Sequence, residues 1–311
     1  MRPPEEVRRL ADRRQQARAE RDFAAADALR TEIETLGWSV RDAPEGYALE
    51  PRPAYPVHRD LTELSPPAPA TTRRASVALL VEGWPEDLRR CVDSVLTHAP
   101  SDVVVVGLDV GNVDAAGDAL HQLAVAEPGR VEEWHVATTP GWGAARSALL
   151  RLDPAEVHVV METSTVLEGD ALSPLLAALA EPPGTGVVAA GWRGADVDVG
   201  DSWRSFTDAG PGEVDALLGY LLAVRRDAAL AAGGFDPRAL AYRNADLELS
   251  LALREQGGRL VVPDSDLPVR QDRHRGFHDS DQAWLTRESR RTYDRLLARF
   301  RGRDDLLAPR T

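Results

Sequence analysis

Carboxylates follow three apolar segments of the chain that read as buried strands: Glu82 after residues 77–81, Asp109 after 103–106 and Glu162 after 157–161. In a parallel sheet the carboxyl ends of the strands meet at one edge, where ligands bind. We therefore expect these acids to line a polar cleft that binds a cation or a sugar. The alternative at any one of them is an ordinary polar strand end, since Asp, Asn and Gly often follow strands.

A fourth carboxylate, Asp246, stands near the start of a predicted helix over residues 247–253. Leucines at every second position would also permit a strand, but the Glu, Ala, Arg and Gln residues around them favour helix. With Asn244 as the cap, Asp246 lies in the first turn, where the helix dipole keeps a carboxylate ionised and pointing outward. Such a group can act as a general base toward a hydroxyl; the alternative is a purely structural helix acid.

Two histidines, His274 and His278, lie among arginines in residues 270–278. An imidazole can bind a divalent ion and an arginine can neutralise a diphosphate, although loop arginines are more often simply solvated. Upstream, Gly233 and Gly234 form a flexible turn that permits close approach of the backbone to a ligand. This part of the chain therefore adds candidate ligand-binding residues to the acid-lined cleft.

The elements that position these residues alternate between strands and helices from Ser76 onward. Predicted strands cover residues 77–81, 103–106, 157–161, 187–190 and 260–262, and predicted helices cover 85–97, 115–125 and 143–152. The strands are continuous apolar runs, as expected for strands that are covered on both faces. This alternation predicts an α/β layer fold with a mostly parallel sheet.

The N-terminal residues have a different texture. Residues 5–36 are good helix formers without internal Gly or Pro, which predicts a helical hairpin whose second helix is capped by Asp22 and ended by Gly37. A strand–turn–strand is expected over 38–49, and the following Pro-rich residues read as a linker. The predicted domains are a hairpin unit (1–50), a linker (51–74), an α/β domain (75–282) and a C-terminal helix with its tail (283–311).

Composition excludes several classes of function. All 37 basic residues are arginine, so lysine Schiff bases and the lysine-containing phosphate loop are excluded. The net charge of −13 argues against general nucleic-acid binding. No apolar run approaches the roughly 18 residues of a membrane span, no apolar secretion signal is visible at the start, and the single Cys91 forms no internal disulfide. We therefore expect a cytoplasmic protein.

Residues 284–301 predict an Arg-rich amphipathic helix with one apolar face. Packing of this face on the α/β domain is the favoured interpretation. The alternative is peripheral attachment to the inner face of the membrane, close to a lipid-linked acceptor.

Four segments, taken in order, resemble family 2 glycosyltransferases with the GT-A fold over about residues 76–307. They are "SVALLVEGWPEDLRRCVDSVL", "VVVVGLDVGN", "TTPGWGAARSALL" and "GGFDPRALAYRNADLELSLALREQGGRL". The last of them is the most specific, since it resembles the acceptor loop and the helix that bears the catalytic base. The resemblance implies a GT-A three-layer α/β/α sandwich, with the helical hairpin as an N-terminal appendage.

The resemblance also implies a chemistry. A nucleotide-diphosphate sugar would be bound by Glu82, Asp109, Arg146 and Glu162, with Arg146 near the phosphates or supporting their loop. Asp246 would deprotonate a hydroxyl of an unidentified acceptor, which attacks the anomeric carbon and inverts it. The residues on the acceptor side would be Gly233, Gly234, Tyr242, Arg243, Asn244 and Glu248. The Glu-Asp pair common in the family appears as Ala245-Asp246, so the base is kept and its acidic neighbour is lost.

The metal slot departs from the pattern of this family. Most such enzymes hold Mg²⁺ or Mn²⁺ with an Asp-x-Asp motif, and the slot reads Glu162-Thr163-Ser164 in this chain. Because these ions often need only one or two carboxylates plus substrate phosphates, Glu162 and Ser164 with His274 could still bind one. Two hypotheses follow: a metal-assisted transferase, or a catalytically weakened GT-A protein that binds a nucleotide sugar or a protein partner without turnover.

Residues 5–50 resemble the C-terminal helical tail of cysteinyl-tRNA synthetase, in the stretch "RRQQARAERDFAAADALRTEIETLGWSVRDAPEGYALEP". The part "RDFAAADALRTEIETL" is also similar to the helical hairpin of nucleotide-excision-repair proteins. Because the nucleotide-binding signatures and zinc cysteines of the synthetase are missing from the sequence, aminoacylation is not implied. The unit is interpreted as a docking element for a protein partner or for self-association. An RNA-associated adaptor is a third hypothesis, which the acidic balance disfavours.

Overall fold

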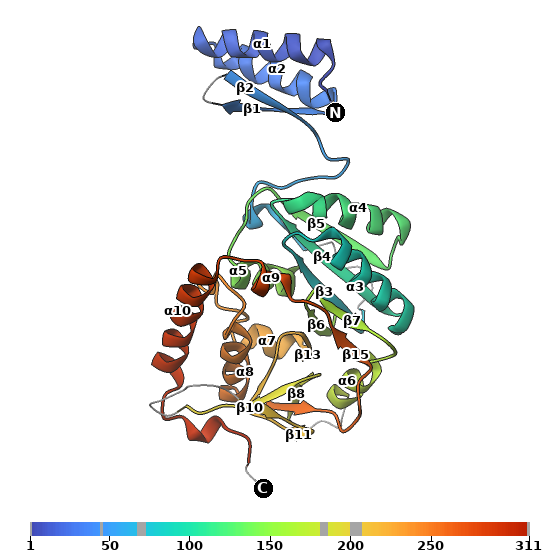
Figure 1. Cartoon of the computed structure of the whole chain (residues 1–311), viewed down its shortest axis with the longest axis vertical. Helices are drawn as coiled ribbons and strands as arrows, with labels where there is room; N and C mark the ends of the chain where they lie inside the picture. Colours follow the sequence, from blue (N-terminus) through green and yellow to red (C-terminus); the bar gives the residue numbers. More distant parts are fainter. Residues whose placement is uncertain (1, 44–45, 67–72, 181–185, 200–206, 310–311) are drawn as a thin grey trace. The chain divides into compact units, whose positions relative to one another are not determined.

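The computed structural model describes residues 2–43, 46–66, 73–180, 186–199 and 207–309 of the chain. The chain forms two compact units, Met1–Pro56 and Val57–Thr311 (Figure 1). Each has a hydrophobic core of its own. The smaller unit combines two helices with a β-hairpin, whereas the larger one is built on an extended sheet.

The smaller unit is a helical hairpin backed by a β-hairpin. Its elements are α1 (Glu5–Ala19), α2 (Phe23–Thr35), β1 (Trp38–Ala43) and β2 (Gly46–Pro51). As predicted, Asp22 caps α2 by accepting a hydrogen bond from the N–H of Ala25 at 3.0 Å, and Gly37 takes the positive φ of 77° that follows the helix. Ile33 and Trp38 belong to the small core between the helices and the hairpin.

The larger unit is built on a sheet that has eight strands among the residues described. In spatial order these are β11 (Gly212–Glu213), β14 (Arg259–Val262), β8 (Val187–Gly191), β13 (Leu221–Arg225), β6 (Val157–Met161), β3 (Ala75–Val81), β4 (Val103–Val110) and β5 (Val131–Val136). Strands β6, β3, β4 and β5 run parallel, β14 is parallel to β8, and β13 is antiparallel to both of its neighbours. The prediction of a mostly parallel sheet is confirmed.

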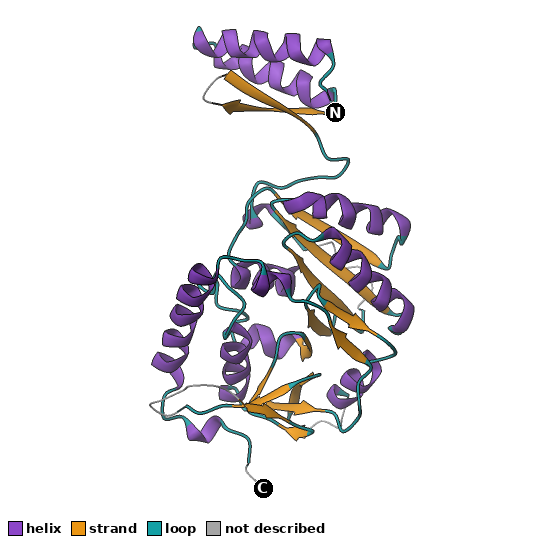
Figure 2. Ribbon diagram, in the orientation of Figure 1, coloured by secondary structure: helices purple, strands orange, loops and turns teal. Residues whose placement is uncertain are grey.

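Helices cover both faces of this sheet (Figure 2). On one face lie α3 (Pro85–His98), α4 (Ala116–Ala126) and α6 (Leu172–Leu179), and on the other lie α5 (Trp142–Leu152), α7 (Arg226–Ala231) and α8 (Ala245–Glu255). Along β3 the side chains of Val77 and Leu79 join the first core, and those of Ala78 and Leu80 join the second. The structure is therefore the predicted three-layer α/β/α sandwich.

Short elements surround the sheet. β7 (Thr165–Leu167) pairs with β15 (Val269–Gln271), and β9 (Gly194–Asp196) lies between β10 (Thr207–Ala209) and β12 (Ala216–Leu217). The remaining helical segments described are α9 (Arg275–His278), α10 (Gln282–Phe300) and the 3-10 turns Leu61–Glu63, Val113–Ala115 and Asp304–Leu306. Because β15 pairs with β7, which closely follows β6, the residues after β15 are brought to the carboxyl end of β6.

The C-terminal helix α10 packs on the larger unit through its apolar face. Leu296 and Phe300 are fully buried in a core that they share with Leu247 of α8. An ion pair supports the same interface, since Arg299 lies 2.6 Å from Glu255. Packing on the larger unit, the favoured interpretation of this apolar face, is thus what the structure shows for Leu296 and Phe300. Among the residues described, no helix is both long and apolar enough to cross a membrane.

Part of the predicted linker is folded onto the larger unit. His58 forms a parallel bridge with Val136 of the edge strand β5, and Leu61 and Leu64 pack against the core on the α5 face. The boundary between the compact units follows Pro56, inside the predicted linker, because these few apolar residues anchor the chain beyond it. Residues 67–72 of the predicted linker lie outside the described residues.

Candidate active site

Two cavities open at the carboxyl ends of the neighbouring strands β3 and β6. The Asp246 cavity, of about 380 Å³, is lined by residues 218–220, 242–244, 246 and 271–274 together with Phe277 and His278. The Trp84 cavity, of about 220 Å³, is lined by Glu82, Trp84, Leu240, Ala241, Gly276, Ser280, Trp284 and Leu285. Trp142, Glu162, Tyr242 and His274 line both. The predicted acids Glu82, Glu162 and Asp246 are therefore brought to one shared site.

A buried arginine donates a hydrogen bond to Glu162 and holds its carboxylate in place. Arg146 of α5 is fully buried and donates hydrogen bonds to Ala78 O (2.8 Å), Met161 O (3.1 Å) and Glu162 Oε1 (2.8 Å). A buried guanidinium needs such partners, because an unpaired charge in the core is costly. Arg146 therefore supports the loop after β6, which is one of its two predicted roles, and its burial leaves it unable to contact a phosphate.

His274 faces the other oxygen of Glu162. Its Nε2 lies 3.8 Å from Glu162 Oε2, and its ring packs edge-to-face on Tyr242 with the ring centroids 4.6 Å apart. Burial alone would raise the pKa of Glu162, but the Arg146 charge and then His274 outweigh it and hold that pKa below its usual value. Glu162 is therefore a carboxylate with one oxygen neutralised by the protein and one directed at the cavities.

Glu82 stands across from this pair. Desolvation raises the pKa of Glu82 to about 7, and repulsion from the Glu162 carboxylate is the second cause, whereas Arg146 and His274 act in the opposite direction. Much of the residue is nevertheless exposed, so solvent screens the repulsion and the carboxylate remains open to a ligand.

The hydroxyl of Ser164, the third residue of the predicted metal slot, has a hydrogen-bond partner within the protein. Ser164 is buried, and its hydroxyl accepts a hydrogen bond from Gln271 Nε2 at 2.6 Å. In the part of the chain that the structure describes, no three His, Cys, Asp or Glu side chains are grouped as metal ligands. The residues that fit a cation are Glu162, through Oε2, and His274. Because Mg²⁺ and Mn²⁺ are often held by one or two protein ligands plus substrate phosphates, this partial set can hold an ion only together with a diphosphate.

Asp246 lies in the first turn of α8, as predicted, with its carboxylate in the wall of the Asp246 cavity. Its Oδ2 accepts a hydrogen bond from Gly219 N at 3.0 Å, and its Oδ1 accepts one from Leu247 N at 2.9 Å. Burial raises the pKa of Asp246 to about 6, which these backbone donors only partly offset. The backbone N–H groups favour the ionised form, as predicted, but desolvation has the larger effect on the pKa of Asp246.

Three neighbours of Asp246 also line its cavity: Tyr242, Arg243 and Asn244. Asn244 occupies the predicted cap position in a left-handed conformation with a φ of 70°, yet its side chain makes no capping bond. Its amide donates instead to Ser289 O of α10 at 3.2 Å. This bond ties the loop before α8 to the C-terminal helix, so α10 helps to position the base-bearing turn.

Asp109 lies apart from both cavities. Its exposure is 1%, His135 Nδ1 lies 3.0 Å from its Oδ2, and Asn112 N donates to its Oδ1 at 3.2 Å. A Cβ added at Gly117 would come within 2.4 Å of the same carboxylate, so the packing around it is closed. The carboxylate of Asp109 is therefore not exposed for the predicted contact with a nucleoside. Its hydrogen bonds instead join β4 to β5 and to the turn after β4.

Other predicted acceptor-side residues are used in packing. Glu248 is buried and pairs with Arg295 of α10 at 3.1 Å. Gly233 and Gly234, with φ of 97° and 69°, form the turn after α7, and a Cβ at Gly234 would lie 3.0 Å from Ser147 Oγ. Neither glycine nor Glu248 lines the Asp246 or Trp84 cavity.

Three aromatic residues that line the cavities, Trp84, Trp142 and Tyr220, were not predicted from the sequence as site residues. Trp84 has a left-handed φ of 53°, which is strained for a tryptophan. Such a conformation marks a loop held for function or packing. The sequence could have indicated two of these residues, because Trp84 and Trp142 each directly follow a glycine at the start of a helix.

The predicted phosphate-neutralising arginines after β15 are already paired. Arg275 lies 3.0 Å from Asp87 of α3, and Arg273 lies 2.5 Å from Asp279. Asp272 in turn lies 2.7 Å from Arg90 of α3. The segment over 272–279 is therefore fastened by ion pairs to α3, beside Glu82 and Trp84.

Comparison with known proteins separates the two units. Residues 3–46 match the family model described as the cysteinyl-tRNA ligase anticodon binding domain. The chain is 54% identical over 48 residues to cysteine–tRNA ligase of Opitutus terrae, and 50% identical over 46 residues to cysteine–tRNA ligase 1 of Burkholderia lata. The matches cover 15% of this chain and 10% of each ligase, so the chain spans about a tenth of these relatives. The resemblance predicted for the N-terminal unit is confirmed.

Two solved structures share the architecture of the larger unit. GalNAc-T7, solved with UDP, GalNAc and Mn²⁺, aligns with a TM-score of 0.57 at 15% identity, over 73% of this chain and 48% of that one. Mannosyltransferase PcManGT from Pyrobaculum calidifontis, in complex with GDP-Man and Mn²⁺, aligns with a TM-score of 0.51 at 17% identity, over 74% and 63%. The predicted GT-A fold is confirmed, and at these identities the likeness concerns the fold.

Proposed function

We propose that the larger unit is a glycosyltransferase that moves a sugar from a nucleotide-diphosphate donor to a hydroxyl group of an acceptor. One observation carries this proposal: Asp246, whose pKa is about 6, stands in the wall of a cavity of about 380 Å³ in a fold shared with glycosyltransferases. Two backbone N–H groups hold its carboxylate, and Glu162 and His274 line the same cavity.

In the proposed reaction Asp246 takes the proton of the acceptor hydroxyl while the hydroxyl oxygen attacks the anomeric carbon. The bond from that carbon to the diphosphate oxygen breaks, its electron pair leaves with the nucleoside diphosphate, and the configuration at carbon inverts. A carboxylate with a pKa near 6 suits this role, because it is ionised at neutral pH and more basic than an ordinary aspartate.

The donor would lie along the Trp84 cavity. Trp84 offers an aromatic surface to the nucleoside, and the open Glu82 carboxylate can accept hydrogen bonds from its hydroxyl or N–H groups. Glu162 Oε2 and His274 Nε2 would hold a divalent ion against the diphosphate. When bound, Mg²⁺ or Mn²⁺ supplies neutralisation of the charge that develops on the leaving diphosphate.

A panel of nucleotide sugars with Mn²⁺ tests the proposal through slow donor hydrolysis and transfer to added acceptors. Asp246→Asn should lower turnover by about 10²–10⁴-fold, the usual contribution of a general base. Asp93→Asn, which alters an exposed aspartate of α3 outside both cavities, is the matched control and should keep wild-type turnover. Turnover that is equal in the wild type and Asp246→Asn would contradict the assignment of the base.

The alternative is a nucleotide-sugar-binding protein of the same fold without turnover. Two hydrogen bonds at the predicted metal slot favour this alternative. Arg146 donates to one oxygen of Glu162, and Gln271 donates to the hydroxyl of Ser164, so both groups already have partners within the protein. In that case UDP, GDP or their sugars would raise the Tm without any hydrolysis. The Tm shift would then be the same in Asp246→Asn as in the wild type.

For the N-terminal unit we propose binding of an RNA stem-loop. The support is its match to a domain described as anticodon binding, together with exposed arginines on α1 that include Arg9 and Arg13. Gel-shift titration of the full chain with a tRNA mixture should give a complex that weakens at least tenfold in Arg9→Glu/Arg13→Glu, and not in the control Arg30→Glu on α2. If no tRNA binds and the chain sediments as a dimer, self-association is the role of this unit.

A further inference from the structure

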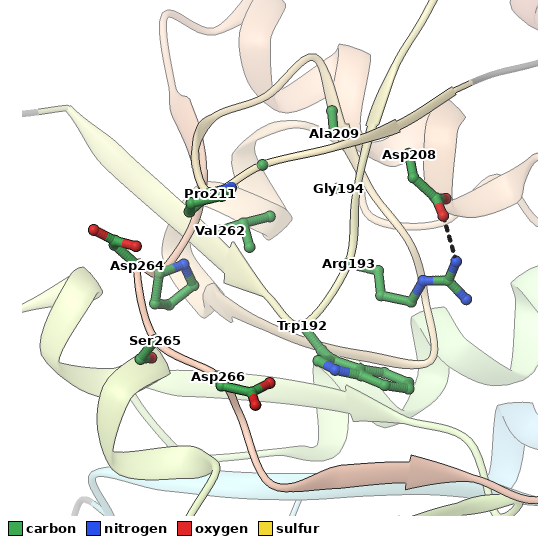
Figure 3. A pocket seen from close by; sticks show the side chains of 12 residues that line it. Trp192, Arg193, Gly194, Asp208, Ala209, Pro211, Val262, Asp264, Ser265 and Asp266 are labelled. Atoms are coloured by element: carbon green, nitrogen blue, oxygen red, sulfur yellow. Dashed lines mark hydrogen bonds and ion pairs between the residues drawn. The ribbon is translucent and has the colours of Figure 1, made fainter.

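A third cavity, of about 480 Å³, lies between the β9–β10 pair and the residues that follow β14 (Figure 3). We call it the Trp192 cavity. It is lined by residues 192–194, 208–211 and 262–266. None of these residues lines the Asp246 or Trp84 cavity, so it is a separate recess in the larger unit.

The walls of the Trp192 cavity combine flat apolar surfaces with hydrogen-bonding groups. Trp192, Pro211, Val262 and Pro263 provide the apolar part. The polar part comes from Arg193, Asp208, Asp264, Ser265 and Asp266. Figure 3 shows the indole of Trp192 below Arg193, with Asp264 on the opposite side of the recess. An aromatic wall packs on the C–H face of a sugar ring, while carboxylates accept hydrogen bonds from its hydroxyl groups, so this lining suits a carbohydrate.

The charge of the cavity restricts the kind of sugar. The lining contains three aspartates and one arginine. The arginine is already paired, since Arg193 lies 2.7 Å from Asp208. Asp264 and Asp266 are both exposed. A phosphate or carboxylate group on a ligand would meet net repulsion, whereas a neutral or amino sugar would not. The cavity therefore favours uncharged or cationic sugar units.

The Trp192 cavity shares a wall with the Asp246 cavity. Trp192 N donates to Leu221 O at 2.9 Å, and Leu218 N donates to Arg193 O at 2.9 Å. The Arg193 guanidinium also lies over the Tyr220 ring, 6.0 Å from its centroid. Leu218 and Tyr220 line the Asp246 cavity, so a single layer of chain separates the two recesses. A ligand that occupies both recesses must therefore pass around this layer, which requires more than one sugar unit.

We propose that the Trp192 cavity is an acceptor subsite for a neutral or amino-sugar oligosaccharide, whose terminal hydroxyl enters the Asp246 cavity. This inference rests on the proposed transferase function. It names the class of acceptor, which neither the fold nor the position of the base defines. It also assigns to Trp192, Asp264 and Asp266 the selection of that acceptor.

Binding of maltotriose, mannotriose and chitotriose to the full chain, measured by calorimetry without any donor, tests the subsite. A trigalacturonate serves as the acidic probe. Trp192→Ala and Asp266→Arg should each weaken binding of the preferred trisaccharide at least tenfold, while Asp93→Arg, the same charge reversal on α3, should leave it unchanged. Asp266→Arg is needed because Trp192 also packs against the core and its truncation could affect folding.

Donor hydrolysis in the absence of acceptor separates this inference from the transferase proposal. Both cavity variants should keep wild-type hydrolysis, because neither residue touches the donor side. If trisaccharide binding depends on Trp192 and Asp266 but no hydrolysis occurs in any protein, the subsite stands and the transferase proposal fails. The subsite is excluded if the wild type binds no neutral or amino trisaccharide, if it prefers the acidic probe, or if both variants bind the preferred trisaccharide as tightly as the wild type does.

Discussion

Asp246 illustrates how opposing local effects set the chemistry of one residue. The backbone N–H groups of Gly219 and Leu247 stabilise its ionised form, as does the start of α8, but burial favours the neutral form more strongly. The resulting pKa of about 6 keeps the carboxylate ionised at neutral pH and lets it gain a proton in mildly acid solution. Both activity and stability should therefore depend on pH through this residue.

The value of kcat/KM for donor turnover should decrease in acid solution, with a midpoint near pH 6. Asp246 must be ionised to accept a proton, so the rate should fall about tenfold per pH unit below its pKa of about 6. Steady-state rates between pH 4.5 and 8 measure this decrease. A flat profile over that range would mean that another group is the base.

Asp246→Asn should stabilise the protein above pH 6. The pKa of Asp246 is raised from 3.8 to about 6 on folding, so its stabilising contribution is complete below pH 3.8 and is lost as pH rises through 6. At pH 8 the neutral Asn avoids that loss, which is on the order of 1–3 kcal/mol. Urea unfolding at pH 8 and pH 4 should show the gain at pH 8 alone, and equal gains at both would rule out ionisation as the cause.

Arg146→Met should strongly destabilise the larger unit. It removes the partner of Glu162 and the donors to Ala78 O and Met161 O from a fully buried position. Loss of one member of a buried ion pair costs about 3–5 kcal/mol. The matched control, Arg151→Met at the exposed end of the same helix, should cost under about 1 kcal/mol in the same urea titration.

At the scale of elements, continuous apolar runs were enough to predict β3, β4, β6, β8 and β14. Strand β5 was missed because it is the edge of the sheet, where Glu132 and Glu133 break the apolar pattern. Strand β13 was missed because its apolar residues lie in the run "ALLGYLLAV", which equally suits a helix. Propensity and periodicity fail at both places, since only pairing with neighbouring strands decides the outcome.

The candidate site was predictable to a similar extent. Glu82, Glu162 and Asp246 could be found from their places at strand and helix ends, and His274 from its place among loop arginines. The roles of Asp109 and Ser164 could not, because each is engaged by a residue distant in sequence, His135 for Asp109 and Gln271 for Ser164. Such pairings depend on tertiary contacts that no local pattern encodes.

The segment that includes α9 is fastened to α3 by partly buried ion pairs, Arg275–Asp87 and Arg90–Asp272, and its mobility should depend on them. Arg275→Gln removes the contact with Asp87, whose side chain is buried, and should speed amide exchange of residues 273–279 at least a few-fold. Arg273→Gln is the control, because the partner of Arg273, Asp279, lies within the same segment. Equal exchange in both variants would show that the contact with α3 does not restrain it.

At the scale of the whole molecule, the chain joins two units that each contain a core but differ greatly in its size. The larger unit has extensive buried clusters on both faces of its sheet, whereas the core of the smaller one is a single cluster around Ile33 and Trp38. A domain with its own core can fold alone, but one of about 60 residues is marginally stable. The two units should therefore differ in stability and separate in function.

Deletion of residues 1–56 tests this separation. Residues 57–311 should keep the main thermal transition within about 2 °C and donor turnover within twofold, because the cores and cavities of the larger unit contain none of the deleted residues. The full chain should show an additional weak transition at lower temperature, which the truncated protein lacks, and the tRNA complex should disappear with it. Calorimetry and gel shifts measure these outcomes; tRNA binding that survives the deletion would assign that binding to the larger unit.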